Sequence, residues 1–335
     1  MKRKTVCEKI LLISDFAIIF AIVALVVFVT FRVTRKYVAQ AESYGGANDN
    51  IVSFEGKKYS YNLDLYTILF MGLDSRGMVW NSEYENVKSC GVQSDTMVLF
   101  ILNMKDRSFK VLPINRDTIT TLDIFDYSGK PSGTSRGQIT LQYAYASGGQ
   151  QSCEYAAKAV SNLLYGVKVD RYVALSLDSI SKLNDQIGGI SLECIEDVHE
   201  TDFKKGDKLN LHGEDAEKYV RNRIHDSSGG NNLRMERQKQ YFKAYVAKYL
   251  KCMKKDITLP LQTYDLLKDD MNTNIKPTEL VKLIGTFKNA DFDGDIYLTE
   301  PGELKFNEAT SHDEFYVDDK ALYKLVLDEF YTEVQ

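Results

Sequence analysis

The hydrophobic pattern divides the chain into one long apolar stretch followed by many shorter runs. Residues 10–31 read ILLISDFAIIFAIVALVVFVTF, and a helix of this length crosses roughly 30 Å of membrane hydrocarbon. We therefore predict a transmembrane helix over 10–31, preceded by a cytoplasmic tail at 1–9. A small, polar, glycine-containing segment at 32–50 reads as a linker, and the extracytoplasmic domain is expected at 51–335.

The residues that flank the apolar stretch bear on its orientation. Positive residues lie on both sides: Lys2, Arg3, Lys4 and Lys9 before it, and Arg32, Arg35 and Lys36 after it. The small excess before the stretch favours a cytoplasmic N-terminus, so we expect a single-pass protein of the cell membrane. A cleaved signal peptide is the alternative, because residues 39–41, Ala-Gln-Ala, have the spacing of a cleavage site. The apolar stretch is longer than such peptides usually carry.

Beyond the linker, short apolar runs alternate with helical patterns. Runs rich in β-branched and aromatic residues predict strands at 66–74, 95–104, 109–115, 172–178 and 190–194. Helical spacing predicts helices at 153–166, 179–189, 233–255, 278–287 and 318–331, and one more strand is expected at 295–300. This alternation predicts an α/β fold, with an α/β/α sandwich around a central mixed sheet.

Composition and motif searches narrow the classes of function. The formal net charge of -5 argues against a general nucleic-acid binder. The four histidines show no metal-ligand spacing, and no phosphate-binding P-loop or dinucleotide fingerprint occurs. Four cysteines fall in the predicted domain without a C-x-x-C pair: Cys90, Cys153, Cys194 and Cys252. A zinc site is therefore not expected, while three disulfide pairings and free thiols all remain open.

Charged residues follow or begin several predicted strands. Asp74 ends the strand at 66–74, and Asp95 begins the strand at 95–104. If these strands are antiparallel neighbours, the two carboxylates lie at the same sheet edge and suit Mg²⁺. The alternative is that each aspartate merely caps a turn. Arg116 and Asp117 follow the strand at 109–115 and would reach the same end, unless they form a simple surface ion pair.

The strongest local signal is a cluster of arginines between residues 221 and 238. Arg221 and Arg223 share a face only if the chain is extended there, whereas Arg234, Arg237 and Gln238 share one face of a helix. The N-terminus of that helix, with bidentate arginine contacts, suits phosphate oxygens. The alternative is a solvated basic helix face.

The charged segments also occur in a characteristic order. Taken along the chain, GLDSR, QSDTM, INRDT, QITLQYAYASGG, GEDAEKYVRNR and LRMERQ resemble the motif series of the LytR-CpsA-Psr family of cell-wall phosphotransferases. The resemblance runs from about Tyr66 to the end of the chain. It implies transfer of an anionic glycopolymer, such as a teichoic acid or capsule-like polymer, from a polyprenyl-pyrophosphate carrier to peptidoglycan. The implied acceptor is the 6-hydroxyl of a muramic acid residue, and polyprenyl phosphate is released.

The resemblance also assigns roles to individual residues. Asp74 and Asp95 correspond to carboxylates that hold Mg²⁺, and the implied catalytic set is Asp74, Asp95, Arg116 and Arg221. The implied pyrophosphate ligands are Arg76, Arg116, Arg221, Arg223, Arg234, Arg237 and Gln238.

The sequence departs from the family pattern at three positions. Asn115 stands where proline is frequent, Gln138 where a basic residue is usual, and Asn231 where aspartate is common. Two other functions therefore stay open: a pyrophosphatase that releases the phosphate of the lipid carrier to water, and a non-catalytic envelope regulator or scaffold.

Overall fold

The computed structural model describes residues 51–78, 89–222, 258–287, 296–310 and 312–334, together with individual residues between 237 and 256. The predicted transmembrane helix at 10–31 lies outside these ranges. Within them, no helix combines the length and apolar character needed to cross a membrane.

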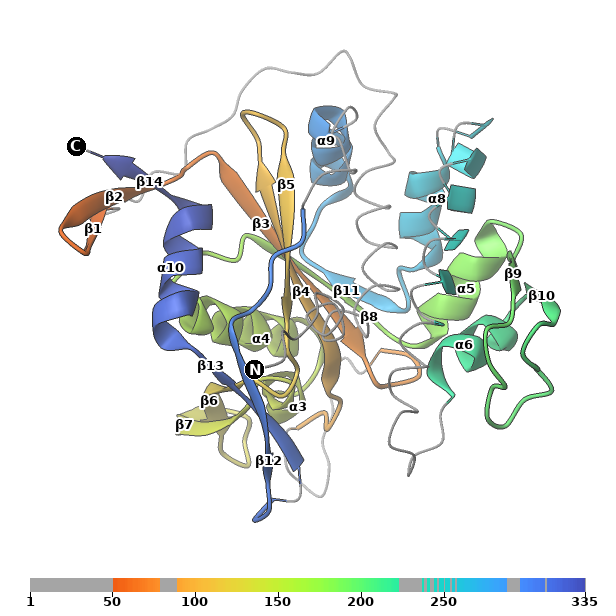
Figure 1. The fold of residues 1–335 in the computed structure, drawn as a ribbon, viewed down its shortest axis with the longest axis horizontal. Helices are drawn as coiled ribbons and strands as arrows, with labels where there is room; N and C mark the ends of the chain where they lie inside the picture. The colour runs from red at the N-terminus through yellow and green to blue at the C-terminus, as the bar shows by residue number, and fades with distance from the viewer. Residues whose placement is uncertain are drawn as a thin grey trace, which may run out of the picture.

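A five-stranded mixed sheet forms the centre of the molecule (Figure 1). Its order is β11 (Met271–Thr273), β8 (Arg171–Leu175), β3 (Leu65–Leu73), β4 (Ser94–Asn103) and β5 (Phe109–Ile114). Strands β3 and β8 are parallel, and the other neighbours are antiparallel. The predicted run at 190–194 instead forms β9 (Ile190–Glu193), which pairs with β10 (Lys208–Leu211) in a separate two-stranded sheet. The mixed α/β fold with a central mixed sheet is thus confirmed.

Helices cover both faces of the sheet because alternate strand residues point to opposite sides. Ile68 and Phe70 of β3 face one apolar core, and Leu69 and Met71 face the other. The first core is closed by α5 (Asp178–Gln186), α6 (Glu214–Arg221), α8 (Leu259–Leu266) and α9 (Pro277–Phe287). The second is closed by α3 (Leu141–Tyr145), α4 (Gly149–Leu163) and α10 (Asp319–Phe330). Figure 1 shows α4 and α10 on one side of the sheet and α5, α6 and α8 on the other.

Local signals set the ends of several helices. Helix α4 begins at Gly149, four positions before the predicted start, and the chain leaves it through Gly166, where φ is +89°. Such a backbone angle favours glycine. Helix α10 begins after Asp318, whose carboxylate accepts a hydrogen bond from the Ala321 N–H at 3.0 Å. This N-cap compensates one of the unpaired N–H groups of the first turn.

Besides the β9–β10 pair, three smaller sheets are formed by the described residues. They are formed by β1 (Ile51–Phe54), β2 (Lys57–Tyr61) and β14 (Tyr331–Val334), by β6 (Ile119–Phe125) and β7 (Pro131–Gln138), and by β12 (Gly302–Asn307) and β13 (His312–Val317). The strand predicted at 295–300 is not formed over its described residues, 296–300. Only a single bridge joins Tyr297 to Val111 of β5, and Pro301 then follows, which has no N–H to continue a ladder.

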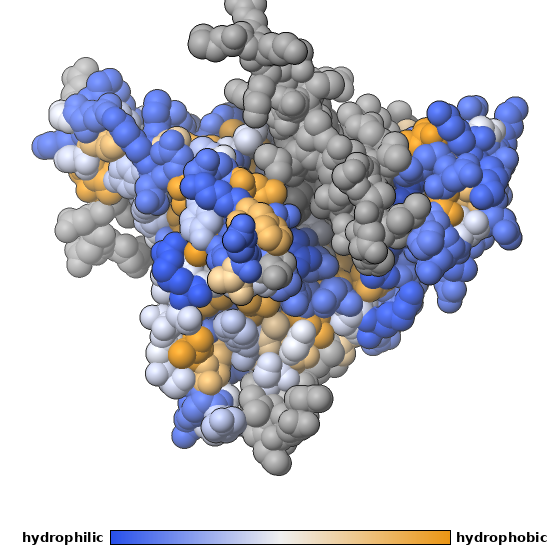
Figure 2. Space-filling view, turned by 60° about the horizontal axis from the view of Figure 1, so that its bottom comes forward, coloured by the Kyte–Doolittle hydropathy of each residue, from blue (hydrophilic) through white to orange (hydrophobic). Residues whose placement is uncertain are grey.

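Hydrophilic residues cover most of the described surface in Figure 2, and hydrophobic residues appear as small separate patches. The exposed large apolar side chains are spread over several elements and include Leu63, Tyr127 and Phe306. Function is therefore better indicated by the charged residues at one end of the central sheet than by an apolar surface patch.

Candidate active site

A bulge between β3 and β4 brings two carboxylates to one edge of the sheet. Gly72 pairs with Thr96 and Leu73 with Ser94, so Asp95 has no opposite residue in this register. Bulges of this kind re-aim a side chain next to functional sites. Asp74 follows β3 directly, and its Oδ1 accepts the Gln93 N–H at 2.8 Å. The antiparallel pairing assumed from the sequence is confirmed, and both aspartates lie at this edge.

Arg116 pairs with two carboxylates near this edge, those of Asp95 and Asp117. Its Nη1 donates to Asp95 Oδ1, its Nη2 donates to Gln93 Oε1 at 3.1 Å, and its Nε lies 3.4 Å from Asp117 Oδ1. The Arg116 and Asp95 side chains are both half-buried. Arg116 is thus an ion-pair partner of the predicted metal-binding aspartate and holds it in place from the end of β5.

The electrostatic surroundings of Asp95 connect four of the predicted site residues. Burial raises the pKa of the Asp95 carboxyl above its usual value, and the negative charges of Asp74 and Asp117 add to this rise. The positive charges of Arg116 and Arg221 act in the opposite direction. Asp74, Arg116 and Arg221 therefore all contribute to the electrostatic surroundings of Asp95.

Arg221 reaches this group from a helix rather than from extended chain. It is the last residue of α6, and only at Asn222 does the backbone become extended. Arg221 and Arg223 would share a face only on extended chain, which α6 does not provide at Arg221. Arg221 follows Glu217 by one turn of α6. Its Nη1 therefore lies 2.6 Å from Glu217 Oε1.

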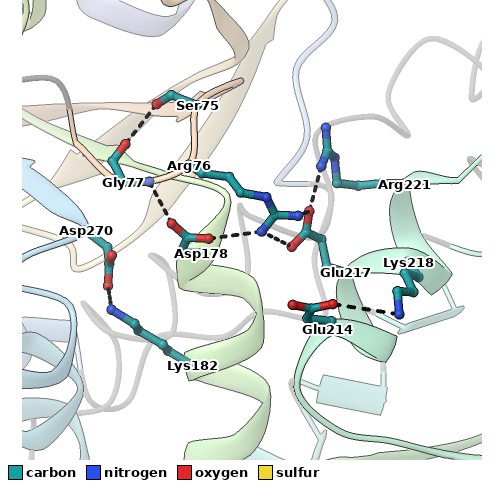
Figure 3. A network of polar contacts seen from close by, with 10 residues as sticks. All are labelled: Ser75, Arg76, Gly77, Asp178, Lys182, Glu214, Glu217, Lys218, Arg221 and Asp270. Atoms are coloured by element: carbon teal, nitrogen blue, oxygen red, sulfur yellow. Dashed lines mark hydrogen bonds and ion pairs between the residues drawn. The ribbon is translucent and has the colours of Figure 1, made fainter.

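Two predicted pyrophosphate ligands form ion pairs with protein carboxylates. Arg76 is ion-paired with Glu217 and Asp178 (Figure 3). Arg237 has a side chain that is only 2% exposed, and its Nε lies 2.6 Å from Glu196 Oε1. Its two Nη groups donate to the carbonyls of Tyr219 and Asn222. Here the structure departs from the prediction, because Arg237 holds the end of α6 through buried contacts.

The remaining predicted ligands, Arg223, Arg234 and Gln238, lie outside the described residues, as does Asn231.

Asp74 and Asp95 are the residues of this edge that would hold a Mg²⁺ ion. Asp74 and Asp95 each have a second carboxylate oxygen besides the Oδ1 that accepts a recorded hydrogen bond. Magnesium typically takes one or two carboxylates and completes its octahedron with water and substrate phosphates. In the described ranges, no cluster of three or more histidine, cysteine, aspartate or glutamate residues is placed to hold a metal. Asp74 and Asp95 would hold the ion together with phosphate oxygens.

Glu300, a buried carboxyl that no sequence pattern indicated, supports the turn that carries Arg116. Glu300 Oε2 accepts the Asn115 N–H at 2.7 Å, and Glu300 Oε1 accepts the Thr118 hydroxyl at 3.0 Å. Burial raises the pKa of Glu300 to about 7. The contact between Asn115 and Glu300 joins positions 185 residues apart, so no local sequence pattern predicts it.

Two of the three departures from the family pattern line this region. Asn115 supplies the N–H that Glu300 accepts, and its Oδ1 accepts the Asp117 N–H at 3.0 Å. Gln138 Nε2 donates to Asp117 Oδ1 at 3.0 Å and to the Asp313 carbonyl at 2.8 Å. These neutral side chains therefore satisfy hydrogen bonds around the turn that carries Arg116.

The structure defines a mixed α/β domain in which an acidic pair, Asp74 and Asp95, lies with Arg116 at one end of the central sheet. The LytR_cpsA_psr family profile matches residues 27–323, and the chain belongs to this family. It is 28% identical over 224 residues to the polyisoprenyl-teichoic acid–peptidoglycan teichoic acid transferase TagV of Bacillus subtilis, covering 64% of this chain and 51% of TagV. It is 31% identical over 186 residues to the transferase TagU of Halalkalibacterium halodurans, covering 55% of this chain and 53% of TagU. The matches thus span about half the length of these relatives.

A solved structure shares the fold. The crystal structure of Bacillus subtilis TagV superposes with a TM-score of 0.52 and 24% identity, covering 80% of this chain and 98% of that chain.

Proposed function

We propose that this chain is a Mg²⁺-dependent phosphotransferase that moves an anionic glycopolymer from a polyprenyl-pyrophosphate carrier to peptidoglycan. The observation that carries the proposal is the meeting of Asp74 and Asp95 with Arg116 and Arg221 at one end of the central sheet. Family membership and the transferase names of the relatives support it. A teichoic acid or capsule-like polymer is the proposed cargo.

The residues of this edge have distinct roles in the proposed reaction. Arg116 and Arg221 offset the negative charge of the pyrophosphate and of the transition state. Mg²⁺ held by Asp74 and Asp95 would offset further charge on the phosphoryl oxygens. The acceptor hydroxyl forms a bond to the phosphorus next to the polymer, the pyrophosphate bridge breaks, and polyprenyl phosphate leaves. One aspartate of the pair takes the hydroxyl proton.

The proposed location follows from the same chemistry. A polyprenyl carrier is embedded in the membrane, and peptidoglycan lies outside it. The apolar stretch at 10–31 would hold the domain at that surface, with the N-terminus in the cytoplasm.

A transfer assay tests the proposal. The full-length chain in detergent receives a radiolabelled lipid-linked polymer and Mg²⁺, with and without a peptidoglycan acceptor. We expect wall-linked label only when the acceptor is present. Equal release of carrier phosphate without acceptor, and no wall-linked label, would identify a pyrophosphatase instead.

A complementation experiment tests catalysis in the cell. A strain lacking the gene receives the parent chain, D95A, or the control R107A, in which Arg107 lies in the turn between β4 and β5 at the opposite end of β4 from Asp95. We expect the parent and R107A to restore wall polymer and D95A to fail. Full restoration by D95A would indicate a regulator or scaffold.

A further inference from the structure

A buried carboxylate lies behind the arginines of the site. The Glu217 side chain is only 4% exposed, and it sits on α6 one turn before Arg221. Its Oε1 accepts hydrogen bonds from Arg76 Nη2 at 2.8 Å and from Arg221 Nη1 at 2.6 Å. Its Oε2 accepts from Arg76 Nη1 at 3.0 Å. Figure 3 shows Glu217 between the two guanidinium groups.

Arg76 is held on its other side by helix α5. Arg76 Nη1 donates to Asp178 Oδ1 at 3.0 Å, and Asp178 Oδ2 accepts the Gly77 N–H at 2.6 Å. Both Nη groups of Arg76 therefore donate to protein carboxylates. These contacts tie the loop after β3 to α5 and α6.

The charges of this network balance around Glu217. A buried carboxylate without a positive partner is strongly unfavourable, and Arg76 supplies this partner through two hydrogen bonds to Glu217. The recorded contact of Arg221 with Glu217 uses Nη1 alone. Arginine has five N–H donors, so this contact leaves donors for an anionic ligand.

We infer that Glu217 is a positioning residue that fixes the Arg221 guanidinium at the end of α6, and that Arg76 serves as the counter-charge of Glu217. The inference rests on the proposed function, because it deepens the role of Arg221 in that site. Charge-assisted hydrogen bonds of this kind fix a guanidinium in one geometry.

Kinetics of E217Q test the inference. Glutamine preserves the shape of the side chain but removes its charge. We expect kcat for polymer transfer to fall about tenfold because Arg221 is no longer fixed. KM for the lipid-linked polymer should change less than about threefold. Loss of the negative charge of Glu217 favours binding of this anionic substrate, which offsets the weaker positioning of Arg221. The control is E214Q on the same helix, since the exposed Glu214 pairs with Lys218 and not with either arginine of the site.

A double-mutant cycle shows whether Glu217 acts through Arg221. In an R221A background, E217Q should lower kcat no further. An equal loss of kcat in both backgrounds would overturn the inference. Thermal melting of each variant identifies loss of folding, and a folded E217Q with unchanged kcat would also overturn it.

A spectroscopic measurement tests the positioning of Arg221 by Glu217 without relying on the proposed reaction. In the full-length chain with ¹⁵N-labelled arginine, the Nη signals of Arg221 should be separate in the parent because rotation of the guanidinium is restricted. They should merge in E217Q and stay separate in E214Q. Separate signals in E217Q would refute the positioning role, whereas absence of polymer transfer by the parent would refute only the proposed function.

Discussion

Replacing Glu300 with glutamine should change how the stability of the protein depends on pH. Glu300 is buried behind the turn of Arg116, and its pKa rises from 4.5 to about 7. The folded protein therefore holds this proton more tightly than the unfolded chain. Its contribution to stability is fully present below pH 4.5 and is lost as the pH rises through about 7.

The size of the effect follows from the two pKa values. Each pH unit between them is worth about 1.4 kcal/mol, so the full loss is roughly 3.5 kcal/mol. Between pH 5 and pH 8 the loss is about 2.5 kcal/mol. E300Q keeps the shape of the side chain and can still pair with the Asn115 N–H and the Thr118 hydroxyl, but it does not titrate.

Urea denaturation of the full-length chain in detergent, followed by circular dichroism at pH 5, 6, 7 and 8, measures this effect. The free energy of unfolding of the parent minus that of E300Q should fall by about 2.5 kcal/mol across this range. The same difference for E308Q, which changes an exposed carboxylate, serves as the control. A difference between parent and E300Q that stays constant to within about 0.5 kcal/mol would refute a protonated Glu300 in the folded protein.

Two further substitutions separate catalytic from structural arginines. R116K loses the two Nη groups that donate to Asp95 and Gln93. The rate of polymer transfer should therefore fall at least about tenfold, while the urea midpoint stays unchanged. Parental activity of R116K would contradict the role of Arg116. R237M removes the buried partner of Glu196, so the free energy of unfolding should fall by about 3 kcal/mol, and a loss under about 1 kcal/mol would contradict its structural role.

The sequence predicted the acidic pair because strong local signals define its two strands. The runs that contain Asp74 and Asp95 have the apolar character of buried strands, and adjacent strands of this kind commonly pair. The bulge that leaves Asp95 without an opposite residue was not predicted, because it depends on the register between the two strands.

Other features of the site depend on packing between distant segments. The partners of Arg237 include two carbonyls at the end of α6, and a carbonyl leaves no trace in a residue pattern. Glu217 was hidden for a similar reason, since its role depends on Arg76, which lies 141 positions away. The small hairpins were missed because strands such as β7 are largely exposed and lack an apolar run.

The Asn115 departure has a direct structural correlate. Its N–H donates to the buried Glu300, and proline at this position would have no N–H to offer. A buried carboxyl that loses a hydrogen-bond partner destabilises the fold. A residue with a backbone N–H at position 115 is therefore needed to pair with Glu300.

The most direct test of the central claim is calorimetric binding of geranyl pyrophosphate to the full-length chain. Asp74 and Asp95 are proposed to hold Mg²⁺ against the pyrophosphate, so the parent should bind this ligand with Mg²⁺ and lose at least about tenfold in affinity with EDTA. A variant with both D74N and D95N should show no such dependence on Mg²⁺. Equal affinity of the parent with and without Mg²⁺, or an unchanged Mg²⁺ effect in the double variant, would contradict the account.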